Sequence, residues 1–265
     1  MIVTPHPDGV DVITSIATIP TIGSIPVNAF VVHGSSPFLV DTGSIVDSDD
    51  FMTALRSVID PGELEWIWLT HTDFDHIGSL HRLLADNPRL RVITSFLGVG
   101  IMGLFDPLPM DRVFLVNPGQ SVAVGDRTLT AVKPPTFDNP ITTGFHDSRT
   151  GALFSADCFG AVLEEVPAGA ADIPAAALRD GQVFWAAADS SWLHKVDPDA
   201  FARDLDSIRA IEPTTIFSAH LPPAPGHMTE QLLDALAAVP SASPFVGPDQ
   251  AAFEEMLAAM TGPVS

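Results

Sequence analysis

Cysteine is nearly missing from this chain, and tyrosine is missing altogether. The single cysteine, Cys158, excludes a disulfide within the chain and any metal cluster held by several cysteines. Basic residues are also few: 12 lysines and arginines stand against 33 acidic residues, for a formal charge of −21. This charge repels the phosphates of nucleic acids and of anionic lipids, so we expect neither as a partner.

Long apolar runs are absent as well. No segment reaches the roughly 18 apolar residues of a membrane span, and the first residues, MIVTPHPDGVDVITS, have neither a basic start nor a long apolar stretch. We therefore expect no membrane association and a cytoplasmic location. Hydrophobic residues still make up 46% of the 265 residues, enough for the core of one large layered domain. The expectation is a single domain over residues 1–265, with a helical tail from about residue 228.

The order of expected elements indicates an α/β protein. Apolar or β-branched runs between glycine and proline turns predict strands over residues 10–19, 26–33, 37–43, 64–70, 91–95, 112–116, 121–125, 128–133, 152–157 and 214–220. Amphipathic segments predict helices over residues 48–59, 77–88, 197–211, 228–239 and 249–260. This order favours two sheets with helices on their outer sides, an αββα sandwich.

The stretch HTDFDH, residues 71–76, follows the apolar run LEWIWLT and precedes an expected helix. Its histidines and aspartates suit zinc, manganese or non-haem iron. His71 and Asp73 can share one direction while Asp75 and His76 turn toward another, so this loop can serve two neighbouring metal ions. Two unpaired carboxylates about 4 Å apart repel by roughly 4 kcal/mol at an effective dielectric near 20. Because lysine and arginine are scarce, a metal is the expected source of balancing charge.

Two further segments, SADCFG and SAHLPP, also lie where an apolar strand ends. They carry Asp157 and His220. Loops at one edge of a sheet converge, and ligands bind there. We therefore expect both side chains to join the 71–76 loop at one site.

These motifs, in this order, resemble the metallo-β-lactamase superfamily, from PVNAFVVHGSSPFLVDTGS through LTHTDFDHIGSL and GALFSADCFG to TTIFSAHLPP. Most hydrolases of that superfamily have a second histidine where this chain has Asp73. A carboxylate there is similar to the flavodiiron and related oxygen-binding di-iron proteins, whose loop reads His-x-Glu-x-Asp-His. The resemblance implies two metal ions. Iron is expected first, with manganese or zinc as alternatives, because an oxygen-rich ligand set favours harder ions.

The resemblance also implies a ligand set, one ion at His71, Asp73 and Asp138, the other at Asp75, His76 and His220, with Asp157 bridging them. The family pattern has a histidine at the position of Asp138. His146 is the alternative ligand, although it lies much closer to Asp157 along the chain. We expect Asp157 and Asp75 to act in catalysis.

The segment FLVDTGS also matches the strand end of aspartic proteases, where two such loops bring two carboxylates together. This chain contains one copy, which argues against a protease. In the metallo-β-lactamase pattern the aspartate here, Asp41, supports the metal ligands through hydrogen bonds. We expect that role for Asp41.

The expected function is that of a di-iron protein that binds or reduces dioxygen or a related small oxidant, as an oxidoreductase or an oxygen sensor. The alternative is a hydrolase of an ester, lactone or phosphodiester, in which Asp157 positions a metal-bound hydroxide. The chain shows no glycine- or threonine-rich flavin loop, so repeated reduction is expected to need an external electron-transfer protein. The apolar segment 96–110 is expected to form a lid or a homodimer contact.

Overall fold

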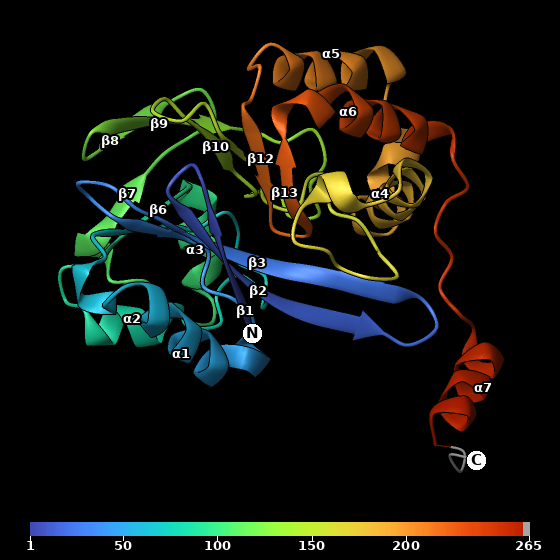
Figure 1. Cartoon of the computed structure of the whole chain (residues 1–265), viewed down its shortest axis with the longest axis horizontal. Helices are drawn as coiled ribbons and strands as arrows, with labels where there is room; N and C mark the ends of the chain where they lie inside the picture. The colour runs from blue at the N-terminus through green and yellow to red at the C-terminus, as the bar shows by residue number, and fades with distance from the viewer. Residues whose placement is uncertain (262–265) are drawn as a thin grey trace.

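Two β-sheets pack face to face, and helices cover their outer sides (Figure 1). The computed structural model describes residues 1–261 of the chain. This arrangement is an αββα sandwich, so the fold class predicted from the sequence is confirmed.

The first sheet has seven strands, which follow one another across the sheet in chain order. They are β1 (Ile2–His6), β2 (Val10–Ile19), β3 (Gly23–Val32), β4 (Phe38–Val40), β5 (Trp66–Trp68), β6 (Arg91–Thr94) and β7 (Val113–Leu115). Strands β1 to β4 pair antiparallel, and β4 to β7 pair parallel. Parallel neighbours need long crossovers. Three helices supply them: α1 (Ser48–Val58), α2 (Leu80–Asp86) and α3 (Phe96–Met102).

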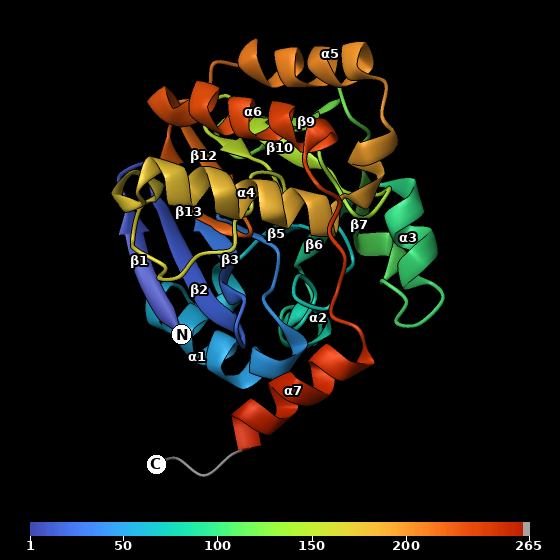
Figure 2. The same ribbon diagram turned by 90° about the vertical axis from the view of Figure 1, so that its right-hand side faces the viewer.

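The second sheet has six strands in the order β13-β12-β11-β10-β9-β8. They are β8 (Ser121–Val124), β9 (Arg127–Val132), β10 (Gly144–Asp147), β11 (Leu153–Phe154), β12 (Thr215–Ser218) and β13 (Leu221–Pro225). Only β11 and β12 pair parallel. Their crossover contains α4 (Ala175–Asp189) and α5 (Pro198–Arg209), and α6 (Thr229–Ala238) follows β13. These three helices cover the outer face of the sheet (Figure 2).

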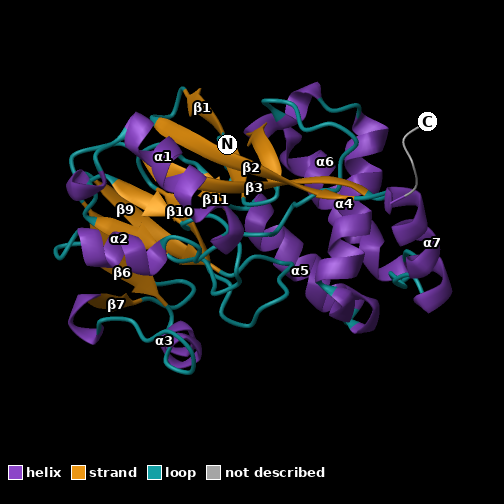
Figure 3. Cartoon of the chain, turned by 90° about the horizontal axis from the view of Figure 1, so that it is seen from below, coloured by secondary structure: helices purple, strands orange, loops and turns teal. Residues whose placement is uncertain are grey.

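Side-chain alternation along β3 explains the layering. Phe30 and Val32 join the core between the two sheets, whereas Ala29 and Val31 join the core under α1 and α2. Successive side chains of a strand point to opposite faces, so a strand buried on both faces is apolar throughout. Seen from below, α1 and α2 lie in front of the strands of the first sheet (Figure 3).

Stacked aromatic rings join the strands that lead to the site. Phe145 of β10 stacks on Phe154 of β11 with centroids 4.5 Å apart, and Phe154 stacks on Phe217 of β12 at 4.8 Å. All three side chains are fully buried, and each contributes about 1.5–3 kcal/mol through removal from water. The stack fixes β11 and β12 side by side, together with the loops that follow them.

Of the α-helices and strands, five were not predicted from the sequence: β1, β10, β13, α3 and α4. The inward face of α4 includes Gly181, Gln182 and Ala186, which give a weak apolar pattern. The proline-rich sequence of β13, LPPAP, argues against a central strand, and β13 is indeed an edge strand.

The two helices after β13 differ in their surroundings. Helix α6 packs with α4 and α5, whereas α7 (Gln250–Thr261) lies apart from the two layers (Figures 1 and 2). The tail predicted from about residue 228 runs on to residues 262–265, which lie outside the described residues. No helix in the described part of the chain is long and apolar enough to cross a membrane.

Segment 96–110 forms α3 and the loop after it. Phe96 and Leu104 are 71% and 87% exposed there. The two roles expected for this segment, a lid or a homodimer contact, stay predictions.

Candidate metal centre

The site lies where strands of both sheets end. Residues 71–76 follow β5, Asp157 follows β11, and His220 lies in the turn between β12 and β13. In each sheet the pair concerned, β4 with β5 and β11 with β12, is parallel. Parallel strands end at a common edge, where ligand sites form. The structure thus brings together side chains that are far apart in the sequence.

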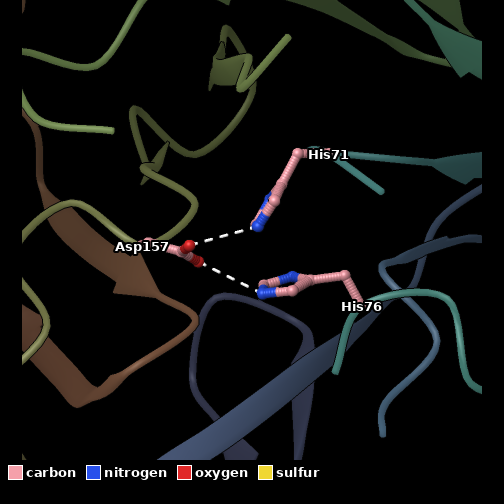
Figure 4. A group of neighbouring side chains, drawn as sticks. All are labelled: His71, His76 and Asp157. Carbon is pink, nitrogen blue, oxygen red and sulfur yellow. Dashed lines mark ion pairs between the residues drawn. The ribbon is translucent and has the colours of Figure 1, made fainter. Parts of the chain in front are cut away.

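Asp157 lies at the centre of three imidazoles. Its Oδ2 is 3.2 Å from Nε2 of His71, and its Oδ1 is 3.2 Å from Nε2 of both His76 and His220. All four side chains are almost completely buried. Figure 4 shows His71 and His76 approaching the carboxylate of Asp157 from one side.

Two groups of potential ligands flank Asp157. In the histidine-rich group, Asp75 Oδ2 lies 3.6 Å from Nε2 of His76 and 3.5 Å from Nε2 of His220. In the aspartate-rich group, one ligand atom each from His71, Asp73 and Asp138 lie within 4.8 Å of one another. The seven side chains expected at the site are therefore close together, in the two sets that were expected.

The outer ring nitrogen of each histidine has its own partner. Nδ1 of His76 lies 2.8 Å from Asp41 Oδ2, and Nδ1 of His220 lies 3.0 Å from the carbonyl oxygen of Pro26. Because a carboxylate and a carbonyl only accept, both rings donate from Nδ1. The remaining nitrogen, Nε2, then carries a lone pair directed at the site when the ring is neutral.

The outer nitrogen of His71, Nδ1, also has a hydrogen-bond partner, the side chain of Thr70. The hydroxyl of Thr70 donates to Asp41 Oδ2 at 2.7 Å, so it can accept from Nδ1 of His71, 3.1 Å away. Asp41 thus supports two of the three rings. Its backbone φ of +56° lies in the left-handed region, which aspartate tolerates better than most residues.

Several atoms at the centre are left without a hydrogen bond. Nε2 of His71, Nε2 of His76 and Oδ1 of Asp157 are buried and have no hydrogen-bond partner among the described residues. An unsatisfied buried polar atom costs about 1–3 kcal/mol. Unpaired imidazole and carboxylate atoms converging on one point fit cations such as iron, manganese or zinc.

The charges at the centre shift pKa values in opposite directions. Burial lowers the pKa of an imidazole, but the Asp157 carboxylate outweighs it: the pKa of His76 lies well above its usual range, and that of His220 is raised to about 9. Burial likewise raises the pKa of Asp157, but the three imidazoles hold it well below its usual range. Metal binding therefore has to displace protons from the rings.

His146 lies away from the centre. It belongs to β10 and pairs across the sheet with Thr130 and Leu153. None of the groups of close ligand atoms found among the described residues contains it. Asp138 is the better candidate, since its Oδ1 lies 4.0 Å from Nε2 of His71.

The family of the chain follows from its sequence. Residues 25–184, more than half of the chain, match the model described as ODP family beta lactamase. The chain belongs to this family. The resemblance to the metallo-β-lactamase superfamily and its flavodiiron branch, inferred from the motifs, is thereby confirmed.

Relatives of this ODP-family chain include two flavoproteins. The diflavin flavoprotein A 1 of Synechocystis is 27% identical over 134 residues, and the flavo-diiron protein FprA2 of Clostridium acetobutylicum is 35% identical over 71 residues. The matches cover 50% and 27% of this chain, but only 23% and 18% of those proteins. A solved structure of the same fold is the rubredoxin oxygen:oxidoreductase of Desulfovibrio gigas, with a TM-score of 0.74 and 21% identity over 90% of this chain and 61% of that one. The chain thus spans less than two thirds of each of these proteins.

Three residues of the site were missed by reasoning from the sequence. The side-chain amide of Asn139 donates to Asp73 Oδ1 at 3.0 Å. Nζ of Lys133 donates to the carbonyls of Pro140 at 2.9 Å and Thr142 at 3.0 Å, which holds the loop that carries Asp138. The third is Asp189 at the end of α4, where burial and the charge of Asp157 raise the pKa to about 7. Only Asn139, next to Asp138, had a signal in the sequence.

Proposed function

We propose that this chain holds two iron ions and uses them to bind or reduce dioxygen or a related small oxidant. The observation that carries the proposal is the convergence of three buried imidazole nitrogens on Asp157, with aspartates completing the group on either side. The proposed ligands are His71, Asp73 and Asp138 on one ion, Asp75, His76 and His220 on the other, and Asp157 between them.

The donor atoms favour iron or manganese over zinc. Four carboxylates and three neutral imidazoles offer a charge of −4, which balances two divalent cations. Oxygen ligands suit manganese and iron better than zinc. Manganese is the second choice, and zinc the third.

The names of related proteins support a redox function for the metal centre. One is a flavo-diiron protein, and one structural neighbour is an oxygen:oxidoreductase that is named for rubredoxin. By analogy, we propose that an external electron-transfer protein reduces the centre. The family model carries the word beta lactamase, a hydrolase name, but the two relatives and the structural neighbour reported above are named as flavoproteins or as an oxidoreductase.

The protein's own part is to hold the ions and to limit access. Bound iron supplies one-electron redox chemistry and open positions for a small ligand. The imidazoles are buried, whereas the side chains of Asp75 and Asp138 are 35% and 26% exposed. We propose that a small molecule enters past these two partly exposed carboxylates, and that Asp75 and Asp157 contact it.

Metal analysis and oxygen uptake test the proposal. The protein is purified without added zinc, loaded anaerobically with iron, reduced, freed of reductant and then mixed with dioxygen. We expect two irons per chain and oxygen uptake in proportion to the iron bound. The control is Asp126→Asn, which changes an exposed aspartate paired with Arg149 and should behave like the wild type. Zinc in place of iron, with turnover of a generic phosphodiester and no oxygen uptake, would overturn the proposal in favour of the hydrolase.

A further inference from the structure

Asp189 brings a further carboxylate to the aspartate-rich side of the site. It is the last residue of α4, and one carboxylate oxygen each from Asp138, Asp157 and Asp189 lie within 4.8 Å of one another. Asp138 also belongs to the aspartate-rich group, whereas no close group links Asp189 to Asp75 among the described residues. Asp189 therefore lies on the Asp138 side of Asp157.

Three imidazoles balance the charge of Asp157, whereas Asp189 forms no ion pair with any group among the described residues. At 4.8 Å, two carboxylates repel by roughly 3 to 4 kcal/mol at an effective dielectric near 20. Across the described residues, no lysine or arginine nitrogen forms an ion pair with any of the three carboxylates. Among the described residues, the Asp189 carboxylate accepts one hydrogen bond, from the Ser190 hydroxyl at 3.1 Å. A bound cation would supply the positive charge that Asp189 lacks.

A buried nitrogen points at the same carboxylates. Within residues 1–261, Nε2 of His71 has no hydrogen-bond partner; it lies 3.2 Å from Asp157 Oδ2 and 4.0 Å from Asp138 Oδ1. His71 is completely buried, and its other nitrogen already contacts Thr70. When the ring is neutral, the lone pair on Nε2 of His71 is thus directed at Asp157 and Asp138, the two carboxylates that Asp189 approaches.

Close packing holds the end of α4 in this place. A Cβ atom on Gly181 would lie 2.2 Å from the carbonyl oxygen of Val162, and one on Gly160 would lie 2.5 Å from Nε1 of Trp185. Both contacts join α4 to the segment directly after Asp157. The Trp185 ring also packs on His220, with centroids 4.6 Å apart. The helix end is therefore fixed relative to Asp157, and the approach of Asp189 is built into the fold.

We propose that Asp189 is an eighth ligand of the metal pair and binds the ion held by His71, Asp73 and Asp138. The proposal rests on the proposed dinuclear function. Metal–oxygen bonds of about 2.1 Å place two ligand atoms of one ion at most about 4.2 Å apart. Carboxylate oxygens 4.8 Å apart need to close in by about 0.6 Å to reach this widest spacing, and by more if they bind at adjacent positions. This ion then has more carboxylate ligands than its neighbour.

The test is a titration of metal-free protein with manganese(II), in which isothermal titration calorimetry measures the binding of each ion. Asp189→Asn keeps the shape of the side chain and removes its charge. We expect the wild type to bind two ions, and Asp189→Asn to bind one of them at least tenfold more weakly while the other is unchanged. Asp189→Glu, which retains a carboxylate, should recover most of the loss. The matched control is Asp180→Asn, on the same helix but exposed and beside Arg179; it should bind like the wild type.

The outcomes separate the two proposals. Two ions bound with wild-type affinity by Asp189→Asn would overturn the role of Asp189 and leave the dinuclear centre intact. A wild type that binds fewer than two ions would overturn the proposed function itself. A third ion in the wild type, lost in Asp189→Asn, would overturn the sharing of one ion by Asp189 and His71. If the asparagine variant does not fold without metal, Asp189→Ser provides the same comparison.

Discussion

The histidine-rich and aspartate-rich groups share Asp157, but the fold holds them differently. His76 and His220 are buried, and their outer nitrogens are bonded to Asp41, after β4, and to a carbonyl of β3. In the other group, Asp138 is partly exposed on a loop, and Asp73 is held by the amide of Asn139. Two of the three ligands in the first group are buried imidazoles held by the core, whereas in the second group only His71 is held in this way and Asp138 depends on a surface loop.

This difference predicts two unequal metal sites. Ligands whose orientation is fixed by partners in the core lose less freedom on binding, so they bind more tightly. Carboxylates on a loop adapt more easily to a change of ion or of oxidation state. We expect the histidine-rich group to fill first and the aspartate-rich group to exchange its ion faster.

The largest effect is expected at the residue that the groups share. Asp157→Ala removes the carboxylate between three imidazoles, so both ions should bind more than roughly 100-fold more weakly, beyond the loss typical of outer partners. Elemental analysis after dialysis measures how many ions the variant retains per chain. Retention of one ion at full strength would mean that Asp157 serves a single group.

The next effect separates the groups. Asp41→Asn weakens the hydrogen bond that orients His76, so the histidine-rich ion should bind about 10- to 100-fold more weakly. The aspartate-rich ion should change less, since Asp41 reaches His71 only through Thr70. A two-site titration distinguishes the ions. Equal losses at both would contradict the separation of the groups.

The pH dependence of stability should reverse with metal. In metal-free protein the pKa of His220 is raised from 6.5 to about 9, so its stabilising ion pair is complete below pH 6.5 and is lost as the pH rises through 9. The metal-free melting temperature should therefore fall from pH 6.5 to pH 9. With metal bound the ring is neutral, and binding strengthens as the pH rises over this range. Thermal melts with chelator and with manganese(II) measure both trends; parallel curves would argue against His220 as a ligand.

The smallest effect is expected on the loop. Asn139→Ala removes the hydrogen bond to Asp73, which is worth about 1 kcal/mol, or roughly a fivefold loss of affinity at the aspartate-rich group. The histidine-rich ion should be unaffected. Calorimetry resolves the two ions, and a loss confined to the histidine-rich ion would show that the groups are assigned the wrong way round.

Most of the site was accessible from sequence because its residues cluster at strand ends. The HTDFDH loop placed four candidates in six positions, and the position of Asp138 followed from the family pattern. Asp189 had no such signal. It ends a helix of weak apolar pattern, and its approach to Asp157 depends on close contacts at Gly160 and Gly181 that no local motif encodes.

By itself the sequence determined the layered α/β architecture, since alternation of side chains and helical spacing are local properties of the chain. It also determined the acidic, imidazole-rich chemistry of the site, since residue type sets which ions a side chain binds. Only the tertiary structure decided which outer nitrogens are bonded, how deeply Asp157 is buried and that Asp189 reaches it. Those depend on the packing of elements far apart in the chain, and packing is a property of the whole molecule.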